Sequence, residues 1–371
     1  SRLKISKYAE SIGSYAFYGL NSLPAISISN NVKEIGSHAF EACSSATALY
    51  LPDSVTTIGA YAFSSCSKIA EIAIPDSVTK MGAYAFSGCS SVKKFSIGSG
   101  VKAIEKYTFK NCTGLTSITV PDTVETIAAD AFYGCNNVTE ITLPFVGESR
   151  TATDHKATFG YVFGYTTYNA AEKKSYDNTG SNYSYGVYSS DTGKEICSTS
   201  YSSNYQERYQ SSRSTTFQNC YVYTSSKPWY TCYDYYNSSY KHYNGTYGPY
   251  NLQTYSYYVP NGLTSVTITD ADKIETAAFN NCKNITKITL NDGVTSIGDY
   301  AFQQCTALKD YAIPETVAKI GSYAYYGDNA LTEMYIPDTV AKISDYAFYG
   351  CSKISRLKIS KYAESIGSYA F

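Results

Sequence analysis

The sequence predicts a repeat solenoid, in which one short structural unit is stacked on copies of itself. A 23-residue phrase, clearest as I-x-x-I-x-I-P-D-x-V-x-x-M-G-x-Y-A-F-x-x-C between Ile69 and Cys89, recurs with drift from Leu3 to Phe371. A period of about 20 to 50 residues indicates that each phrase is one coil of a solenoid. Equivalent side chains then stack over one another, so a side chain of the wrong volume disturbs both neighbouring coils.

The strictest part of the phrase is its aromatic position, which recurs every 23 residues in two blocks. Alanine precedes it except at Thr108, and isoleucine lies five residues before it except at Met81. We expect these three columns in the core. The aromatic positions are Phe17, Phe40, Phe63, Phe86, Phe109, Phe132, Phe279, Phe302, Tyr325, Phe348 and Phe371.

Each phrase predicts a strand, a corner and a turn. The I-x-I segment alternates apolar and polar residues, which indicates a short strand with one face inward. The proline that follows, as at Pro75, closes the strand, and Ile-Gly then predicts a bend. Y-A-F-x-x-C is too short for an independent helix, so we expect one helical or 3₁₀ turn. Strands of successive phrases would pair in parallel about 4.8 Å apart.

One long insert interrupts the repeats. The predicted domains are repeats at 1–144, an inserted island at 145–260, and repeats again at 261–371. The island is rich in Tyr, Ser, Thr, Asn and Gly and holds 23 of the 41 tyrosines. Scarce aliphatic residues favour a flexible loop. Tyrosine alternating with small polar residues favours β-strands, so we expect a Tyr-rich β-type island docked against the solenoid.

The A-F-x-x-C and I-P-D-x-V motifs resemble the leucine-rich repeats of the BspA-like family, the Treponema pallidum type. The resemblance covers the chain outside the insert, whose segments L-P-F-V-G-E-S-R (143–150) and F-G-Y-V-F-G (159–164) resemble an insertion in some bacterial members. It implies a curved, secreted or cell-surface solenoid with a role in adhesion or surface structure, and it supplies no catalytic residues. The predicted fold is a right-handed leucine-rich-repeat coil.

Composition gives no sign of nucleic acid, membrane or catalysis. The 30 basic and 31 acidic residues nearly cancel, so no basic surface for nucleic acid is expected. No run of 18 apolar residues predicts a membrane span. The histidines His38, His155 and His242 lie far apart without a partner pattern. We therefore expect no enzyme, no cofactor and no metal site.

Eight of the eleven cysteines share one position of the phrase. Metal binding needs convergent ligands with short spacings such as C-x-x-C, which are absent, and stacked parallel cysteines suit the torsion of a disulfide poorly. We favour a column of buried thiols over a metal ladder or disulfides. The column is Cys43, Cys66, Cys89, Cys112, Cys135, Cys282, Cys305 and Cys351, with Leu20 and Asp328 as replacements.

The insert holds the other three cysteines. The segment from Cys220 to Cys232 is predicted to fold as a hairpin about Ser226 that places these two cysteines opposite each other. A disulfide there would stabilise an island that is short of aliphatic core. The alternative is three free thiols, with Cys197 the third.

A tyrosine column lies two residues before the aromatic position. His38, Asp130 and Ala277 interrupt it, which indicates partial exposure. It is interpreted either as a packing ladder or as a contact stripe for another chain or a glycan, since tyrosine is enriched at interfaces. Its members are Tyr15, Tyr61, Tyr84, Tyr107, Tyr300, Tyr323, Tyr346 and Tyr369.

Six N-x-S/T sequons are candidates for glycosylation in a secreted eukaryotic context. They are Asn111, Asn137, Asn182, Asn237, Asn244 and Asn284.

The two ends of the sequence are identical. Residues 1–17 and 355–371 both read SRLKISKYAESIGSYAF, so they agree even at variable positions. This predicts a tandem unit of 354 residues and, because neither end carries a polar capping turn, a segment of something longer. We expect an extracellular filament whose modules stack head to tail on copies of themselves. The alternative is a truncated cell-surface adhesin that binds host protein or glycan through its concave face or Tyr-rich insert.

Overall fold

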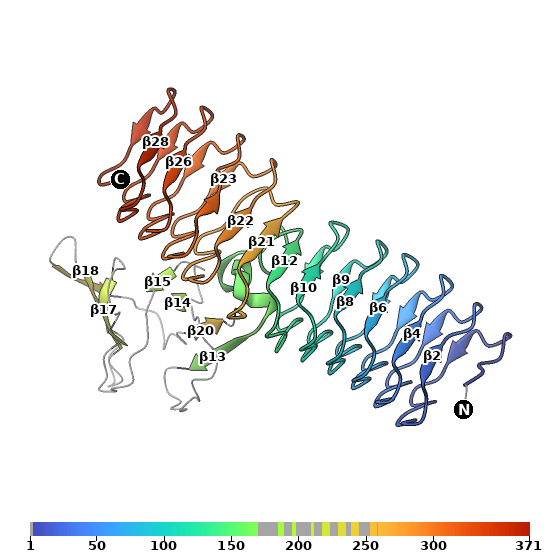
Figure 1. Ribbon diagram of the computed structural model, residues 1–371. Helices are drawn as coiled ribbons and strands as arrows, with labels where there is room; N and C mark the ends of the chain where they lie inside the picture. Colours follow the sequence, from blue (N-terminus) through green and yellow to red (C-terminus); the bar gives the residue numbers. More distant parts are fainter. Residues whose placement is uncertain are drawn as a thin grey trace.

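The computed structural model describes residues 3–169, 185–188, 195–197, 209–210, 217–222, 229–234, 239–244, 253–257 and 259–371. For the strands between residues 165 and 256 it describes the backbone alone. In these residues the repeats coil into a solenoid of stacked turns (Figure 1). The predicted repeat solenoid is confirmed.

A ladder of parallel strands, built from the predicted I-x-I segments, runs along one face of the solenoid. Ile26 pairs with Leu49, 23 residues later, and a buried central residue lies between more exposed neighbours, as on Glu71–Ala73. The strands are β2 (Ala25–Ser27), β4 (Ala48–Tyr50), β6 (Glu71–Ala73), β8 (Lys94–Ser96), β10 (Ser117–Thr119), β12 (Glu140–Leu143), β21 (Ser265–Ile268), β22 (Lys287–Thr289), β24 (Asp310–Tyr311), β26 (Glu333–Tyr335) and β28 (Arg356–Lys358).

A second parallel ladder occupies the position where a bend was expected. Ile35 pairs with Ile58 in the same 23-residue register, and Ile274 continues the ladder as an isolated bridge to Ile297. The sequence analysis therefore missed one short strand in each coil. These strands are β1 (Ser11–Ile12), β3 (Glu34–Ile35), β5 (Thr57–Ile58), β7 (Lys80–Met81), β9 (Ala103–Ile104), β11 (Thr126–Ile127), β23 (Ser296–Ile297), β25 (Lys319–Ile320), β27 (Lys342–Ile343) and β29 (Ser365–Ile366).

The Y-A-F-x-x-C segments form successive tight turns rather than helices. The Ser64 N–H donates to the Tyr61 carbonyl at 3.0 Å, the i→i+3 bond of a 3₁₀ turn. The intervening Phe63 N–H donates to the Ala85 carbonyl of the next coil at 2.8 Å. Tyr61 has a φ of 58°, in the left-handed region, which interrupts the helical backbone. Half of these amides thus bind the neighbouring coil.

The core is a set of vertical columns, as the sequence predicts. The rings of Phe40 and Phe63 stack with centroids 5.5 Å apart at 3°, and Phe63 stacks on Phe86 at 5.4 Å. The alanines beside them are fully buried. Thr108, the exception in the alanine column, is also fully buried, and its hydroxyl donates to the Glu105 carbonyl at 2.8 Å. The hydroxyl is tolerated because it has this partner.

The strand ladder continues across the insert. β12 pairs directly with β21 in parallel, with Glu140 opposite Ser265 and Leu143 opposite Ile268. β22 then pairs on the far side of β21. The strands on either side of the insert are therefore neighbours in space, and green and orange coils adjoin in Figure 1.

The F-G-Y-V-F-G segment completes the coil in which the insert begins. The Phe132 N–H donates to the Val162 carbonyl at 2.9 Å, as the Phe109 N–H does to the Ala131 carbonyl. The Phe163 ring lies 6.4 Å from the Phe132 ring. Phe159, within the 3₁₀ helix η2 (Phe159–Val162), stacks on Phe279 at 5.1 Å. Residues 159–163 thus pack in the solenoid core, although the predicted island begins at Phe145.

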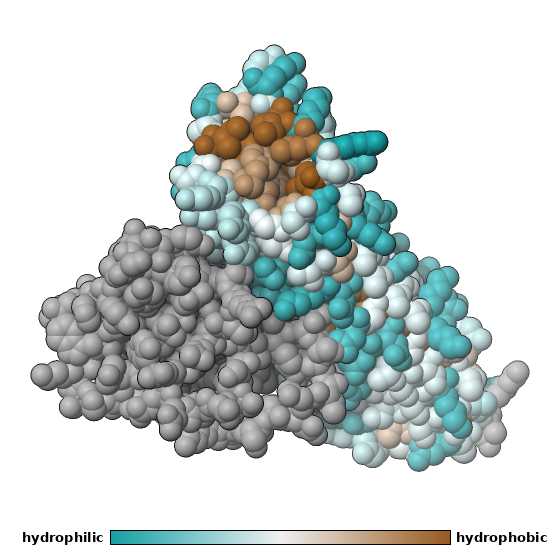
Figure 2. Space-filling model, turned by 60° about the vertical axis from the view of Figure 1, so that its left-hand side comes forward, coloured by the Kyte–Doolittle hydropathy of each residue, from teal (hydrophilic) through white to brown (hydrophobic). Residues whose placement is uncertain are grey.

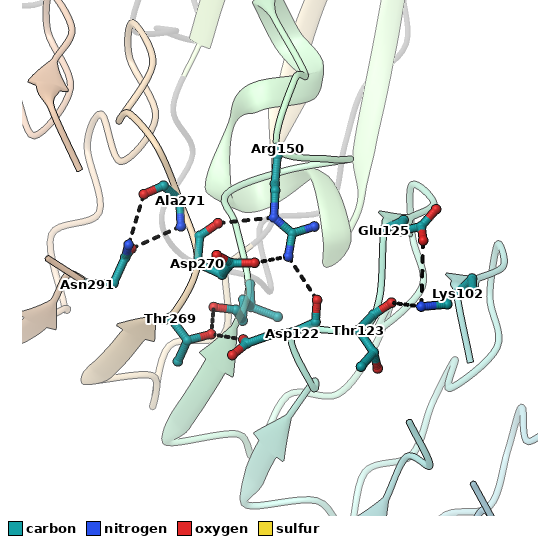
Figure 3. A network of polar contacts seen from close by, with 10 residues as sticks. Lys102, Asp122, Thr123, Glu125, Arg150, Thr269, Asp270, Ala271 and Asn291 are labelled. Carbon is teal, nitrogen blue, oxygen red and sulfur yellow. Dashed lines mark hydrogen bonds and ion pairs between the residues drawn. The ribbon is translucent and has the colours of Figure 1, made fainter. Parts of the chain in front are cut away.

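Arg150 ties the two edges of the insert together (Figure 3). Its guanidinium donates to the Asp122 carbonyl at 2.8 Å, to the Asp270 carbonyl at 3.2 Å and to the Asp270 carboxylate. Thr269 donates to the Asp122 carboxylate and, at 3.2 Å, to the Leu143 carbonyl. One cation thereby joins the coil before the insert to the chain that returns from it.

The rest of the insert contributes backbone strands in two antiparallel sheets, ordered β13-β20-β14-β15 and β16-β17-β18-β19. The predicted docking of this island against the solenoid lies outside the described residues. Its elements are η1 (Asp154–Ala157), β13 (Tyr165–Asn169), β14 (Tyr185–Tyr188), β15 (Glu195–Cys197), β16 (Tyr209–Gln210), β17 (Phe217–Val222), β18 (Trp229–Asp234), β19 (Ser239–Asn244) and β20 (Gln253–Tyr257).

Asp328 is a carboxylic acid in the cysteine column. It is fully buried, and among the described residues neither of its carboxyl oxygens has a hydrogen-bond partner. Burial raises the pKa of Asp328 well above its usual value. The group therefore costs stability once the pH is high enough to favour its charged form in the unfolded chain.

Asp328→Cys should stabilise the protein by about 1–3 kcal/mol at pH 7, because it removes an unsatisfied buried polar group. The folded-state pKa is raised, so the acid's penalty is smallest near pH 4 and grows as the pH rises above the unfolded value. Urea unfolding at pH 4.5 and pH 7 measures both. Cys305→Asp, the reverse change one coil away, is the control and should destabilise by a similar amount. A gain that is independent of pH would contradict the account.

Candidate interaction surface

Tyrosine rings stack in a ladder along one side of the N-terminal block. Tyr15, His38 and Tyr61 are parallel, with centroids 4.4 and 4.7 Å apart. Tyr61 and Tyr84 follow at 4.4 Å, and Tyr107 is tilted at 4.8 Å from Tyr84. Each ring covers the face of its neighbour and turns its edge outward, so all five side chains are at least half-buried except the exposed Tyr15.

The ladder rests on a repeated unusual backbone conformation. Every residue in the position has a positive φ, between 52° at Tyr369 and 62° at Asp130. An L-residue other than glycine pays of order 1 kcal/mol or more there. Stacked rings, which contribute about 0.5–1.5 kcal/mol per pair beyond their buried area, offset that cost. The sequence carries no glycine signal at this position, so periodicity alone did not predict the conformation.

Cations lie against the middle of the ladder. The Lys110 ammonium is 4.7 Å from the centroid of Tyr107 and 5.5 Å from that of Tyr133. Lys106 is 3.2 Å from the buried Asp130 carboxylate. Burial, and then the Asp130 charge, raise the pKa of Tyr107, so its phenol stays neutral at physiological pH.

The predicted column forms two ladders rather than one. Asp130 and Ala277 lack rings, so the N-terminal ladder ends at Tyr107, with Tyr133 edge-on at 6.1 Å. The second ladder begins at Tyr300 and continues through Tyr323, Tyr346 and Tyr369 with centroids 5.1, 4.9 and 5.0 Å apart.

A further pair of tyrosines widens the C-terminal ladder. Tyr326 and Tyr349 stack at 5.4 Å, and each lies 5.6 Å from the ladder ring three residues earlier, Tyr323 and Tyr346. The sequence analysis did not single them out, although their 23-residue spacing was visible. Tyr349 and Tyr369 are exposed. This cluster, called here the double ladder, is the broadest aromatic surface among the described side chains.

The repeat cysteines form a buried column of thiols. Each thiol for which a partner is described donates to the carbonyl of the aromatic residue one coil earlier; the Cys66 sulfur is 3.2 Å from the Phe40 oxygen and the Cys305 sulfur 3.1 Å from the Phe279 oxygen. Burial raises the pKa of Cys89 and of Cys282 to about 12. The eight residues Cys43, Cys66, Cys89, Cys112, Cys135, Cys282, Cys305 and Cys351 are buried and unbridged.

The backbone register of the insert pairs Cys220 on β17 with Cys232 on β18. The loop about Ser226 and the side chains of these cysteines and of Cys197 lie outside the described residues, so the disulfide stays a prediction.

The sequons are spread over both blocks and the insert. Asn111 and Asn137 are exposed, whereas Asn284 is half-buried. The amide groups of Asn137 and Asn284 donate to backbone carbonyls one coil earlier, at 2.7 and 3.0 Å. Asn244 is described by its backbone on β19 alone, and Asn182 and Asn237 lie outside the described residues.

Within the described ranges, no group of three or more His, Cys, Asp or Glu side chains lies close enough together to hold a metal ion. In the part of the chain that the structure describes, no helix has the length and hydrophobicity that crossing a membrane needs.

Stacked coils with two parallel ladders and an Ala-Phe core define a leucine-rich-repeat solenoid. The BspA type leucine rich repeat region matches in six copies, over residues 1–116, 102–149 and 250–371. The chain therefore belongs to this family, as the resemblance in its motifs implied.

Solved structures of bacterial leucine-rich-repeat proteins are similar to parts or most of the chain. The Treponema pallidum leucine rich repeat protein is 34% identical over 35% of this chain and 61% of its own, with a TM-score of 0.35. A leucine rich cell surface protein of Faecalibacterium prausnitzii is 22% identical over 95% of this chain and 77% of its own (TM-score 0.36). A leucine-rich repeat protein of Bacteroides ovatus is 21% identical over 95% and 83% (TM-score 0.33). The match to the T. pallidum protein spans less than two thirds of that protein's length. No curated protein matches.

Native protein at pH 8 should react with a thiol reagent at no more than the three insert cysteines, because the eight column thiols are buried and protonated. Urea should expose all eight. A Cys220–Cys232 disulfide would leave only Cys197 reactive and would add two hydrogens to the intact mass on reduction. Counting labels by mass spectrometry tests both points, and labelling of Cys89 or Cys282 in the folded chain would contradict the buried column. Cys197→Ser is the control that identifies the remaining label.

Proposed function

We propose that the chain is a structural subunit of an extracellular or cell-surface filament, in which 354-residue modules stack head to tail. The observation that carries the proposal is one turn that occurs twice. The N-terminal turn (residues 1–17) and the C-terminal turn (residues 355–371) have the same sequence but different neighbours. Copies of this chain would be its first partners.

The two occurrences accept neighbours on opposite faces. In the N-terminal turn, Ile12 pairs with Ile35 of the following coil. In the C-terminal turn, the equivalent Ile366 pairs with Ile343 of the preceding coil. The same 17 residues therefore fit between the coil that ends one module and the coil that begins the next.

The spacing at such a junction matches that inside the solenoid. Phe371 stacks on Phe348 at 5.2 Å, and its counterpart Phe17 stacks on Phe40 at 5.0 Å. Within the block, Phe40 and Phe63 are 5.5 Å apart. One turn placed between the two modules would continue the aromatic column, both strand ladders and the tyrosine ladder without a break.

A chain in which residues 1–354 are followed directly by residues 1–371 tests the proposal. Electron microscopy should show one unbroken rod about twice the length of the single module, because each coil adds about 4.8 Å along the axis. A matched chain with a Gly-Ser linker after residue 354 should show two rods joined by a flexible hinge. A hinge in the directly joined chain as well would reject the filament.

The second candidate function is adhesion to a host protein or glycan. The double ladder favours it, because exposed tyrosines on a rigid support bury a large area at low entropic cost and are enriched at interfaces. Tyr349 is 41% and Tyr369 66% exposed. The Tyr-rich insert and the strand-ladder face are further surfaces for such a partner.

Binding of the single soluble chain to arrays of glycans and extracellular host proteins tests adhesion. The double substitution Tyr326→Ser and Tyr349→Ser should weaken saturable binding about tenfold or more, since hot-spot tyrosines each contribute 1–2 kcal/mol or more. Tyr50→Ser is the control, because Tyr50 is 62% exposed but lies on strand β4. Absence of saturable binding, or equal loss in both variants, would reject the double ladder as an adhesive site.

A further inference from the structure

The two terminal turns expose complementary faces. Ile12 is 4% exposed, because the following coil covers it, whereas the equivalent Ile366 is 50% exposed. Conversely Ala16 is exposed, while the equivalent Ala370 is 3% exposed against the preceding coil. Each turn is thus covered on the face that the other leaves open.

The open face of the C-terminal turn is apolar. Leu357, Ile366 and Phe371 are 42%, 50% and 44% exposed. Figure 2 shows hydrophobic side chains gathered on this end of the solenoid with hydrophilic ones around them. Exposed apolar surface rimmed by polar residues is typical of an interaction site.

The chain itself shows what covers this face. In the N-terminal turn, the Ile12 carbonyl accepts the Gly36 N–H at 2.8 Å, and the Phe17 N–H donates to the Ala39 carbonyl at 2.8 Å. Glu10 is 3.0 Å from Lys33. Ile366, Phe371 and Glu364 carry the same groups, so the coil at residues 18–40 of another copy would satisfy them in the same way.

We infer that copies of this chain associate by turn exchange: the C-terminal turn of one molecule takes the place of the N-terminal turn of the next. The displaced residues 1–17 leave the coil at residues 18–40, and residues 355–371 of the neighbour dock there. The inference rests on the head-to-tail stacking proposed above and adds the mechanism by which separate chains achieve it. The partner is a second copy of the chain.

Pre-organisation favours the exchange. The contacts made with residues 18–40 are the same before and after, because the sequences are identical. The incoming turn is already ordered by its own preceding coil, with the Gly367 N–H bonded to the Ile343 carbonyl at 2.9 Å. The displaced turn regains conformational freedom. An ordered donor therefore replaces a segment whose ordering has an entropic cost, which compensates the cost of association.

Identical substitutions at the two equivalent isoleucines should have opposite effects. Ile366→Asp changes a residue that is exposed in the single molecule but buried in the exchanged junction, so it should abolish association without unfolding the chain. Ile12→Asp changes a buried contact of the segment to be displaced, so it should promote association. Sedimentation velocity over a range of concentrations should give Ile12→Asp a dissociation constant at least about tenfold lower than that of Ile366→Asp, with the unsubstituted chain between them.

Circular dichroism of each variant controls for folding, and the double variant should be monomeric like Ile366→Asp. Equal association of the two single variants, or monomers throughout, would overturn turn exchange. A directly joined two-module chain that is still one rod would then leave the filament standing as a covalent tandem. A hinged two-module chain would reject the filament itself, so the two failures are distinguishable.

Discussion

The structure depends on a constant register between coils. Every strand pair in the regular blocks joins residues 23 positions apart, and the amides of the tight turns bond across the same interval. This register places alanine over alanine and phenylalanine over phenylalanine, so each coil supplies the wall against which the next one packs. A single coil lacks a core of its own, and stability is a property of neighbours.

The periodic positions of the sequence predicted this architecture, and the exceptions show what periodicity cannot carry. The Phe, Ala and Ile columns and the I-x-I strands follow from side-chain type and spacing. The second ladder was missed because two residues per coil are too few to show alternation. The positive φ at the tyrosines was missed because tyrosine does not signal that conformation, which neighbouring coils impose.

The insert was the hardest segment to assign. Its composition marks a change of structure, yet Phe159 and Phe163 belong to the core that the composition appears to leave. F-G-Y-V-F-G lacks the 23-residue spacing, and only the hydrogen bond from Phe132 to Val162 reveals that it replaces the usual Ala-Phe pair. Arg150 and Asp270 are 120 residues apart in the chain, so their contact was beyond any local pattern. The tyrosine positions were predicted, but the division into two ladders followed from Asp130 and Ala277.

The direct pairing of β12 with β21 separates the length of the insert from the pitch of the solenoid. Because the chain leaves and returns through neighbouring coils, the excursion acts as a loop whose closure cost grows only slowly with the number of residues in it. Such a site tolerates replacement of its contents by foreign sequences, provided that Arg150 and the Phe159–Phe163 segment remain. The same coil is thus a natural attachment point for displaying other domains along a rigid support.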